Sequence, residues 1–480
     1  MAGSTTRCTS HRGRLIVRGT VLAAAACIAA ACTGAGITAA TASSGAAGAT
    51  TSNAADWPMY NQNVSRTGVA PGLAPAGALS TAWTAHLDGA VYGQPLVVGG
   101  DVIAATENDS IYAVSAATGT VIWRTHVGTP VPQSKLHGCG DIFPLGITGT
   151  PAYDESNGLV YAVAEITGYH HMLVAVSAVN GTVKLHRYLD APTKSNQPAY
   201  NQQRPGLIIW KGRVYASFGG LAGDCGPYQG SVVGAPLTGN GPLVRWMTPT
   251  ARGGAIWATA GPAAGPGGNL WIAIGNGAAE KATDHYDGSD SVTELTPALK
   301  RVGYFAPSIW RSDNVTDLEL GSTQPALMPG GTTFIVGKRA VGYLLNTTKL
   351  GGIGGQLASA PGICTGKVRG AAAVSGSVVY EPCVNGGIAA VQVNSATRKI
   401  TVLWHGPAAS NGSPVVGGGV VWVTHNTATA GTLYELDPAT GAVLQQIAIP
   451  QGLPHFSSLS LSGGRAYVST LTGITAINGA

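Results

Sequence analysis

Charge is the scarcest feature of this 480-residue chain, since Asp, Glu, Lys and Arg together make up only 10% of it. Aromatic residues are also few, at 6%, whereas glycine occurs 70 times. A helical protein of this size would carry far more Glu and Lys on its solvent-facing sides. The composition instead favours many short strands joined by tight turns, because glycine adopts the positive φ angles that such turns need.

The formal net charge of +5 does not indicate a nucleic-acid partner. Four arginines lie within the first 32 residues, which contain no acidic residue, and the rest of the chain carries 23 basic and 22 acidic residues. Binding to a phosphate backbone requires clustered positive charge. The near balance beyond residue 32 therefore excludes a nucleic acid as the expected partner.

Several short motifs are missing from the sequence. There is no CxxCH for covalent haem, no GxSxG nucleophile elbow, and no cysteine–histidine spacing typical of zinc. No pair of acidic residues stands in a pattern typical of glycoside hydrolysis. A hydrolase on this chain is therefore poorly supported.

Residues 1–32 are typical of an export signal, because arginines up to Arg18 precede VLAAAACIAAAC, which is too short to span a bilayer. Cys32 ends an approximate lipoprotein cleavage box in which Ala29 stands where a good box has Leu. Lipidation at Cys32 and cleavage around residues 39–47 both stay open. Either outcome predicts an extracytoplasmic protein, secreted or lipid-anchored at the outer face of the cell membrane, followed by a flexible tether over residues 33–55.

The cysteines divide at the same boundary. Of seven, the first two leave with the signal and Cys32 is lipidated or lost. An even number remains, which in an exported protein favours disulfides. Four cysteines allow three pairings, and we expect Cys364–Cys383, within one repeat, and Cys139–Cys225, in adjacent repeats.

A repeat dominates the rest of the chain. Eight times a glycine-bearing turn is followed at once by a short β-branched or aromatic run, at intervals of 42 to 63 residues. The turns are Gly99-Gly100, Asn157-Gly158, Lys211-Gly212, Gly267-Gly268, Gly330-Gly331, Ser375-Gly376, Gly417-Gly418 and Gly463-Gly464. A period of this size with four strands per unit predicts an all-β fold, an eight-bladed β-propeller over residues 56–480.

The last repeat stops after three strands, SLSLS, RAYVST and GITAIN. The missing strand has a candidate at the other end of the domain, STAWTAHL over residues 80–87. Closing the ring with this N-terminal strand removes an exposed sheet edge, so we expect seven complete blades and one composite blade.

The topology predicts which loops share a face. In a four-stranded blade, the loop leading into the inner strand and the loop between the second and third strands emerge on the same side. We therefore expect one mouth of the central channel to carry Gln94, Thr148, Gln203, Arg204, Trp257, Gln324, Arg369, Asn411 and His455 from the first kind of loop, and Glu107, Asn108, Glu165, Asn276, Lys338, Asn385 and His425 from the second. A ligand is expected at this mouth.

Three segments, VSAATGTVIW, VSAVNGTVKL and ELDPATGAVLQ, have the form of quinoprotein repeats, in which a tryptophan docks onto the next blade. Trp123, Trp246 and Trp404 occupy that docking position, and DWPMYNQNVSRTG from Asp56 to Gly68 is similar to the segment that leads into the ring. From about Asp56 onward the chain resembles the quinoprotein alcohol dehydrogenase-like β-propellers. That family includes pyrroloquinoline quinone (PQQ) dehydrogenases and propellers without a cofactor, such as the outer-membrane assembly lipoprotein.

The resemblance implies a set of site residues. In LWIAIGNG, Asn276 matches the Gly-Asn turn that supplies a calcium ligand, and Glu165 is the nearest match to the calcium-binding glutamate. In VGKRAVGYLLN the basic residue that contacts the quinone oxygens falls to Lys338, or to Arg339 with a shift of one residue. The catalytic aspartate would be Asp317 or Asp313.

Gln203, Trp257 and Arg369 on the same rim complete the expected cofactor contacts. Each of these residues also has an ordinary structural explanation, such as a turn asparagine or a solvated loop charge. The adjacent cysteines that cover the cofactor in many family members are absent.

Two functions follow from the sequence. We expect a monomeric, non-catalytic binding or scaffold module that presents its channel mouth to a protein or an envelope component. The alternative is a PQQ- and calcium-dependent oxidoreductase acting on an alcohol or a sugar, in which calcium polarises the quinone and a carboxylate removes the alcohol proton.

Overall fold

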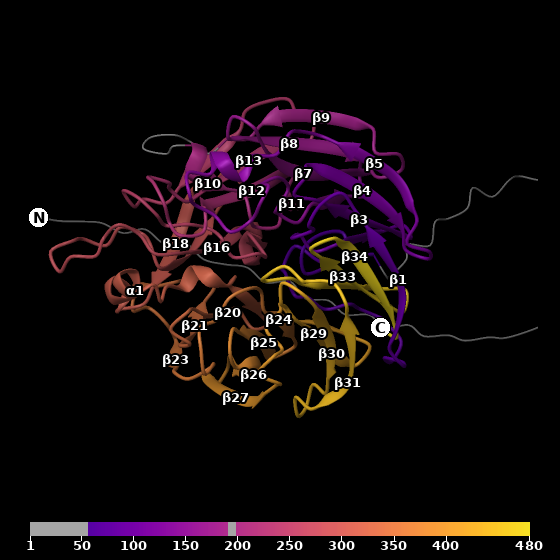
Figure 1. Cartoon of the computed structure of the whole chain (residues 1–480). Helices are drawn as coiled ribbons and strands as arrows, with labels where there is room; N and C mark the ends of the chain where they lie inside the picture. Colours follow the sequence, from indigo (N-terminus) through magenta and orange to yellow (C-terminus); the bar gives the residue numbers. More distant parts are fainter. Residues whose placement is uncertain (1–55, 191–197) are drawn as a thin grey trace, which may run out of the picture. The chain divides into compact units, whose positions relative to one another are not determined.

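The protein, as a computed structural model, is described over residues 56–190 and 198–480, which form eight β-sheets arranged as blades around a central channel (Figure 1). The predicted eight-bladed propeller is confirmed. The predicted export signal with Cys32 and the tether 33–55 lie outside the described residues. Among the described residues, no helix is long and apolar enough to cross a membrane.

The first four blades follow one another along the chain, and each begins with a short inner strand. Their strands are β2 (Leu96–Val98), β3 (Asp101–Ala105), β4 (Ser110–Ser115) and β5 (Val121–His126); β6 (Ala152–Asp154), β7 (Leu159–Ile166), β8 (His170–Ser177) and β9 (Val183–Tyr188); β10 (Asn201–Gln202), β11 (Ile208–Trp210), β12 (Arg213–Gly220), β13 (Ser231–Pro236) and β14 (Val244–Met247); β15 (Ala263–Ala264), β16 (Leu270–Ile274), β17 (Ser291–Leu295) and β18 (Arg301–Ala306). The edge strand β18 is extended by parallel pairing with β22 (Gly352–Ile353).

The remaining blades continue the order around the ring. Their strands are β19 (Ala326–Met328), β20 (Thr332–Val336), β21 (Gly342–Asn346) and β23 (Ala358–Ala360); β24 (Ala373–Ser375), β25 (Val378–Cys383), β26 (Gly387–Asn394) and β27 (Lys399–His405); β28 (Val415–Gly417), β29 (Val420–His425), β30 (Gly431–Leu436) and β31 (Val443–Ile449); β32 (Leu459–Ser462), β33 (Arg465–Thr470) and β34 (Gly473–Asn478). The helices are short: α1 (Trp310–Thr316) and the 3-10 turns η1 (Gln133–Lys135), η2 (Pro198–Tyr200), η3 (Pro266–Gly268) and η4 (Leu320–Ser322).

The ring closes as predicted. β1 (Ser80–His86) pairs antiparallel with β34, from Ser80 opposite Asn478 to His86 opposite Gly473. One N-terminal strand therefore completes the eighth blade, and pairing of the two ends of the domain leaves no open edge between the first and last blades.

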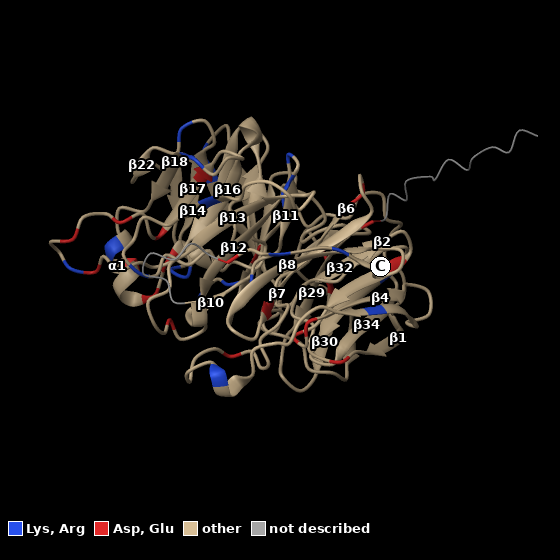
Figure 2. Cartoon of the chain, turned by 90° about the horizontal axis from the view of Figure 1, so that it is seen from above, with Lys and Arg blue, Asp and Glu red and all other residues tan. Residues whose placement is uncertain are grey.

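The middle strands are buried on both faces because each blade packs between two neighbours. β16 reads LWIAI and all five of its residues are buried, without alternation of apolar and polar positions. The outer strand β5, by contrast, exposes four of its six residues. Acidic and basic residues are interspersed along the ribbon (Figure 2), so the described part of the chain shows no basic stripe.

Tryptophans from the outer strands join consecutive blades. The indole nitrogens of Trp83, Trp123 and Trp404 each donate a 3.0 Å hydrogen bond to a carbonyl in the turn of the next blade. Their rings lie against turn glycines, Gly119, Gly181 and Gly441, where an added Cβ would collide with the ring. Trp246 packs into the core shared with the fourth blade. The predicted docking role of Trp123, Trp246 and Trp404 is thereby confirmed.

Residues 57–70 close the central channel from one end and are called the plug below. Asp56 precedes it and accepts a hydrogen bond from Gly99 in the β2–β3 turn, on the face opposite the loops of the channel mouth. Farther in, Trp57 Nε1 donates to Gln94 Oε1 at 2.9 Å, and Asn61 Nδ2 donates to the Ala372 carbonyl at 3.0 Å. The plug thus ties inner strands from separate blades together.

Arg66 is the centre of the plug and is only 1% exposed. Its guanidinium donates to the carbonyls of Tyr60 and Leu207, both at 2.8 Å, and of Pro262 at 3.1 Å. No acidic side chain of the described residues forms an ion pair with it, and burial lowers its pKa to about 9. Three carbonyl dipoles therefore compensate one buried charge, and the two from Leu207 and Pro262 fix the plug to the third and fourth blades.

Replacing Arg66 by Met should lower the free energy of unfolding by about 3 kcal/mol or more, because each buried carbonyl left unpaired costs about 1–3 kcal/mol. Denaturant unfolding of the propeller domain, residues 56–480, measures this loss. Arg245→Met, on the exposed side of β14, is the matched control and should leave stability unchanged. Equal stabilities of the two variants would show that the plug does not depend on Arg66.

Candidate functional site

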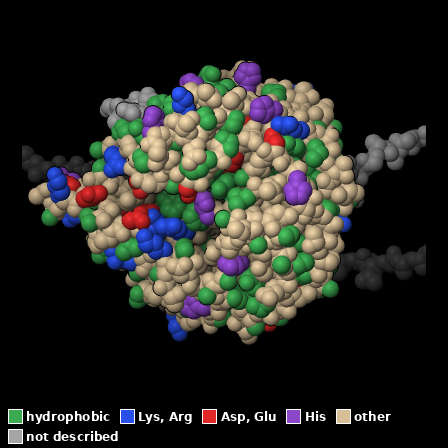
Figure 3. Space-filling view, viewed as in Figure 1, with side chains coloured by type: hydrophobic (Ala, Val, Ile, Leu, Met, Phe, Trp, Pro, Cys, Tyr) green, Lys and Arg blue, Asp and Glu red, His purple; other side chains and the backbone are tan. Residues whose placement is uncertain are grey.

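A cavity of about 380 Å³ opens at the channel mouth opposite the plug. Its polar, charged and aromatic lining residues are Asp141, Arg204, Asp224, Trp257, Asn276, Asp317, Glu319, Lys338, Arg369 and Phe456. Figure 3 shows basic and acidic side chains beside each other around a hollow near the middle of this face. The wall is charged, and the mouth is not filled by apolar side chains.

The cavity is blind. Beneath Arg204 and Phe456 there remains a void of only about 10 Å³, which is room for about one water molecule. Tyr60 of the plug lines this void and hydrogen-bonds Thr259 at 3.1 Å. A ligand can therefore enter only from the loop side.

The structure brings together five of the residues predicted from the sequence, Trp257, Asn276, Asp317, Lys338 and Arg369. They come from loops of the fourth, fifth and sixth blades, which the blade topology aims at the same mouth. The shared location of Trp257, Asn276, Lys338 and Arg369 was predicted from strand order, and the structure agrees with it. Asp317 was expected from the family resemblance.

Three other predicted residues lie elsewhere. Glu165 contacts His171 at 3.3 Å and is nearly inaccessible, so the two predicted calcium ligands are not brought together. Asp313 pairs with Arg339 outside the cavity wall. The side-chain amide of Gln203 donates to the Pro205 carbonyl at 2.5 Å, which makes it a support of its own loop.

The position of Glu165 has a simple cause. It stands directly opposite His171 in the β7–β8 ladder, and directly paired residues share one face of the sheet. His171 packs edge-on against Phe218 of the third blade, with ring centroids 4.9 Å apart. Glu165 therefore faces the third blade and not the channel.

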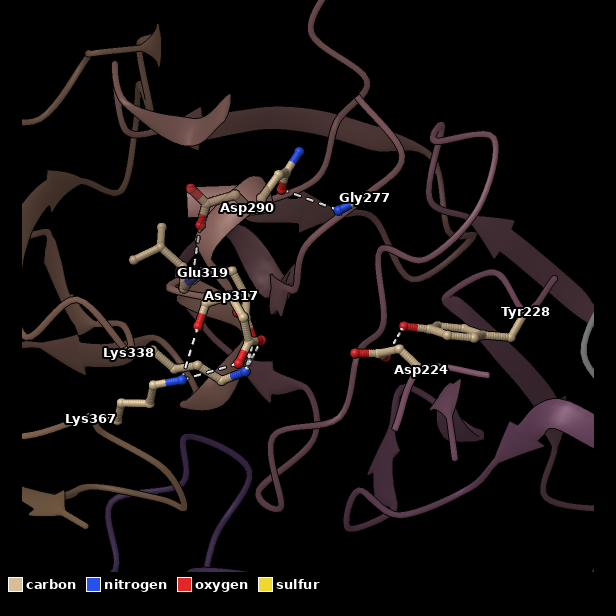
Figure 4. Close-up of polar contacts among 10 residues, drawn as sticks. Asp224, Tyr228, Gly277, Asp290, Asp317, Glu319, Lys338 and Lys367 are labelled. Carbon is tan, nitrogen blue, oxygen red and sulfur yellow. Dashed lines mark hydrogen bonds and ion pairs between the residues drawn. The ribbon is translucent and has the colours of Figure 1, made fainter. Parts of the chain in front are cut away.

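Lys338 is the centre of the charged wall. Its Nζ lies 2.5 Å from Asp317 Oδ1 and 2.8 Å from Glu319 Oε1, and Lys367 Nζ lies 3.1 Å from the other oxygen of Asp317. Figure 4 shows these four side chains meeting on one side of the site, with Asp224 and Tyr228 across the space. Two lysines and two carboxylates thus form one network at the cavity wall.

The two carboxylates have opposite protonation tendencies. Burial raises the pKa of Asp317, but hydrogen bonds and charge from Lys338 and Lys367 outweigh it and leave that pKa below its ordinary value. Burial raises the pKa of Glu319, and Lys338 offsets this only in part. Neighbouring acids whose pKa values are pushed apart are typical of sites that move a proton.

Aromatic rings form the floor of the cavity. The rings of Trp257 and Phe456 have centroids 6.1 Å apart, Lys338 Nζ lies 5.2 Å from the first ring, and the Arg204 guanidinium lies 5.5 Å from the second. Arg204 also contacts Asp141 at 3.3 Å. The floor thus combines apolar ring faces with positive charge.

Arg369 differs from the other cations of the wall. Over residues 56–190 and 198–480 no carboxylate forms an ion pair with it, whereas Lys338 has two such partners and Arg204 has one. Its Nε is buried without a hydrogen-bond partner in the same residues. Arg369 is therefore a cation at the mouth that has a hydrogen-bonding group to spare.

Both predicted disulfides are confirmed, and both brace this mouth. Cys139–Cys225 joins the loop of Asp141 to the loop of Asp224, and Cys364–Cys383 anchors the loop that carries Lys367 and Arg369. The covalent links therefore hold loops, which would otherwise be the most mobile parts of the wall.

Sequence reasoning missed Glu319, Asp141 and Phe456. Glu319 follows Asp317 by two residues, and this spacing of two acids was the one available signal. Asp141 and Phe456 stand in loops whose path depends on the disulfide and on the ring closure. No local pattern marks them.

Two further carboxyl groups, those of Asp290 and Asp313, lie behind the cavity wall. Asp290 is fully buried and accepts a 2.7 Å hydrogen bond from the backbone of Leu320. Burial raises the pKa of Asp290 well above its ordinary value, and the charge of Asp313 adds to the effect. Burial therefore favours the protonated form of Asp290, and the bond that its Oδ1 accepts from Leu320 holds the segment next to Glu319 in place.

Asp290→Asn should stabilise the protein near neutral pH. The folded state binds a proton at Asp290 that the unfolded chain releases above its ordinary pKa of 3.8, so stability falls as pH rises from about 4 toward the folded pKa. Asparagine copies the protonated form and removes this loss. Thermal unfolding at about pH 4, 6 and 8 should show a gain in Tm that grows with pH.

Glu155→Gln, in an exposed turn, serves as the control and should show no such trend. A destabilisation by Asp290→Asn that does not change with pH would contradict the raised pKa of Asp290.

Comparison with known proteins agrees with the fold. A family model described as outer membrane protein assembly factor BamB matches residues 78–223. No curated protein sequence matches the chain.

Solved structures are similar over most of the chain. Quinohemoprotein alcohol dehydrogenase from Comamonas testosteroni has a TM-score of 0.66 at 15% identity, covering 88% of this chain and 80% of that one. A europium-containing methanol dehydrogenase has a TM-score of 0.61 at 15% identity, covering 88% and 91%. BamB from Moraxella catarrhalis has a TM-score of 0.55 at 14% identity, covering 84% and 97%.

At these identities the structural likeness shows the fold alone, and it includes both dehydrogenases and BamB. This chain is therefore similar to the PQQ-like β-propellers, in sequence over residues 78–223 and in fold over most of its length.

Proposed function

We propose that this protein is an extracytoplasmic binding propeller that takes up a small anionic ring compound in the blind cavity of its channel mouth. The observation that carries the proposal is Arg369, a cation without an ionic partner among the described residues, at the wall of a cavity floored by Trp257 and Phe456. A guanidinium binds a carboxylate through two parallel hydrogen bonds, and a ring face packs on an aromatic floor.

Further features support a location outside the cytoplasm and a role in binding. Both disulfides favour an oxidising compartment outside the cytoplasm. The likeness to BamB leaves a protein or envelope component at the rim as a further partner of the same face. The cavity favours the small molecule, because a flat protein surface would not need a pocket closed by a plug.

The second candidate function is PQQ-dependent oxidation of an alcohol or a sugar. The acids Asp317 and Glu319, with pKa values pushed apart, stand beside Lys338 on a wall that Asn276 and Trp257 also line. This donor set fits the quinone: Lys338 and Arg369 would hold its oxygen atoms and carboxylates, and Trp257 would contact its ring. When bound, PQQ accepts the hydride of such an oxidation.

The residues present do not assemble the expected calcium site. Asn276 lines the cavity, but Glu165 does not, and the nearby carboxylates are already paired with lysines. No three His, Cys, Asp or Glu side chains of the described residues are grouped to hold a metal ion. What this chain can supply by itself is Asp317, ionised at neutral pH and able to accept a proton from a hydroxyl at the wall.

Titration of the mature protein with PQQ, followed by calorimetry and tryptophan fluorescence, tests the binding function. Arg369→Gln should weaken binding about tenfold, since a charged hydrogen bond contributes about 1.5–3 kcal/mol and 1.4 kcal/mol is a factor of ten. Trp257→Leu should weaken it about twofold to tenfold, since an aromatic contact contributes about 0.5–1.5 kcal/mol. Lys349→Met, on an exposed loop, should change nothing. Binding that is equal in all four proteins would place the ligand outside this cavity.

A dye-linked assay with alcohols and sugars tests the second candidate, in the presence of PQQ with and without calcium. Asp317→Asn should lower the rate of dye reduction about a hundredfold or more, because a positioned proton acceptor contributes about 10²–10⁴ in rate. The affinity for PQQ should stay within about threefold of that of the unchanged protein. Tight PQQ binding without any dye reduction would remove the oxidoreductase and leave the binding propeller.

A further inference from the structure

A second cavity of about 220 Å³ lies beside the first, toward the seventh and eighth blades. It shares Asp141, Arg369 and Phe456 with the first cavity and adds Val384, Asn411, Asn426 and His455. The two spaces are therefore compartments of one mouth. Apart from Arg369, which lines both cavities, no residue assigned to the quinone lines the second one.

Phe456 forms the border between the compartments. Its backbone has a φ of 62°, in the left-handed region that bulky residues rarely adopt, and its ring packs edge-on against His455 with centroids 4.8 Å apart. Backbone of this kind costs free energy in a bulky residue, and strained residues cluster at binding and active sites. Together with Trp257, the ring offers an apolar floor across the border.

The second compartment is polar but almost neutral at its far wall. Asn411 Oδ1 accepts a 2.8 Å hydrogen bond from the backbone of Asn426. Neither the side-chain oxygen nor the side-chain nitrogen of Asn426 has a partner among the described residues. Buried amides without partners are costly, and a hydroxyl, which both donates and accepts, would satisfy both atoms.

Arg369 stands where the two compartments meet and lines both. A ligand bound across the border would thus present a carboxylate to Arg369, an apolar ring face to Trp257 and Phe456, and hydroxyls to Asn411 and Asn426. A flat aromatic acid lacks the hydroxyls, and a neutral sugar lacks the charge. A sugar bearing a carboxylate has all three.

We infer that the ligand of this mouth is an acidic saccharide of at least two units, of the uronic acid class, which spans both compartments. The inference rests on the proposed binding function and narrows its ligand. The carboxylate of one unit is held by Arg369, and the hydroxyls of the next unit are held by the asparagines.

Calorimetric titration of the mature protein with galacturonic acid and with digalacturonic acid tests the inference. The disaccharide should bind about tenfold more tightly, because two further hydrogen bonds of about 0.5–1.5 kcal/mol each are made in the second compartment. Asn426→Ala, and separately Asn426→Leu to keep the volume, should remove this advantage and leave the monosaccharide unaffected. Arg369→Gln should weaken both ligands about tenfold.

Asn240→Ala, in an exposed turn of the third blade, is the matched control. If polygalacturonate competes with digalacturonic acid for the cavity, the natural ligand is the end of a polymer. If polygalacturonate does not compete, the natural ligand is a free sugar. Equal binding of the two acids, or equal loss of both in the Asn426 variants, would overturn the inference. If neither acid binds, but PQQ binds and Arg369→Gln weakens that binding, the saccharide inference is wrong and the proposed binding function is retained. If nothing binds, both fall.

Discussion

The buried guanidinium of Arg66 is the contact on which the arrangement of this propeller depends. A ring of eight blades leaves a hole on its axis, and side chains of the inner strands alone do not fill it. The plug fills it from one face, and Arg66 joins that plug to carbonyls of the third and fourth blades. Because one end is closed, the other end becomes a pocket with a floor.

The circumference of the ring depends on a second, repeated contact. Tryptophans of outer strands lie on turn glycines of the next blade and donate to its carbonyls. The contact needs a glycine because any side chain would occupy the space of the ring. Stability is thus carried by the blades and the plug, and the mouth loops are free to hold buried charges and a strained phenylalanine.

Much of the fold could be predicted from the sequence because it repeats. Each glycine turn with its strand gave one blade, and the short eighth repeat with STAWTAHL gave the closure that β1 and β34 confirm. Both disulfides were predicted from position in the repeats. The loops of Trp257, Asn276, Lys338 and Arg369 were placed correctly because strand order fixes the face from which a loop emerges.

The details of the site could not be predicted because they depend on side-chain direction and on loops without a local pattern. Glu165 lies near the end of β7 that leads to the channel mouth, as expected, but its side chain faces the third blade because it is paired with His171. Glu319 becomes part of the site only because Lys338 approaches it from another blade. The role of Arg66 was likewise invisible, since its partners lie more than one hundred residues away in two of three cases.

The structural neighbours, dehydrogenases and BamB, are similar to this ring in fold but are proteins of different function. In the present chain the mouth keeps an open, charged cavity, which favours a small ligand. The fold does not decide between these uses, because function depends on the site and not on the architecture.

On the proposed function the channel mouth is a ligand pocket built around Arg369, and a crystal structure of the protein with an iodinated aromatic carboxylate is the most direct test of this. We predict anomalous iodine density over Trp257 and Phe456, with the carboxylate on Arg369, and no density there in Arg369→Gln crystals. Iodine bound only on the outer surface, or a cavity filled by its own loops, would contradict the account.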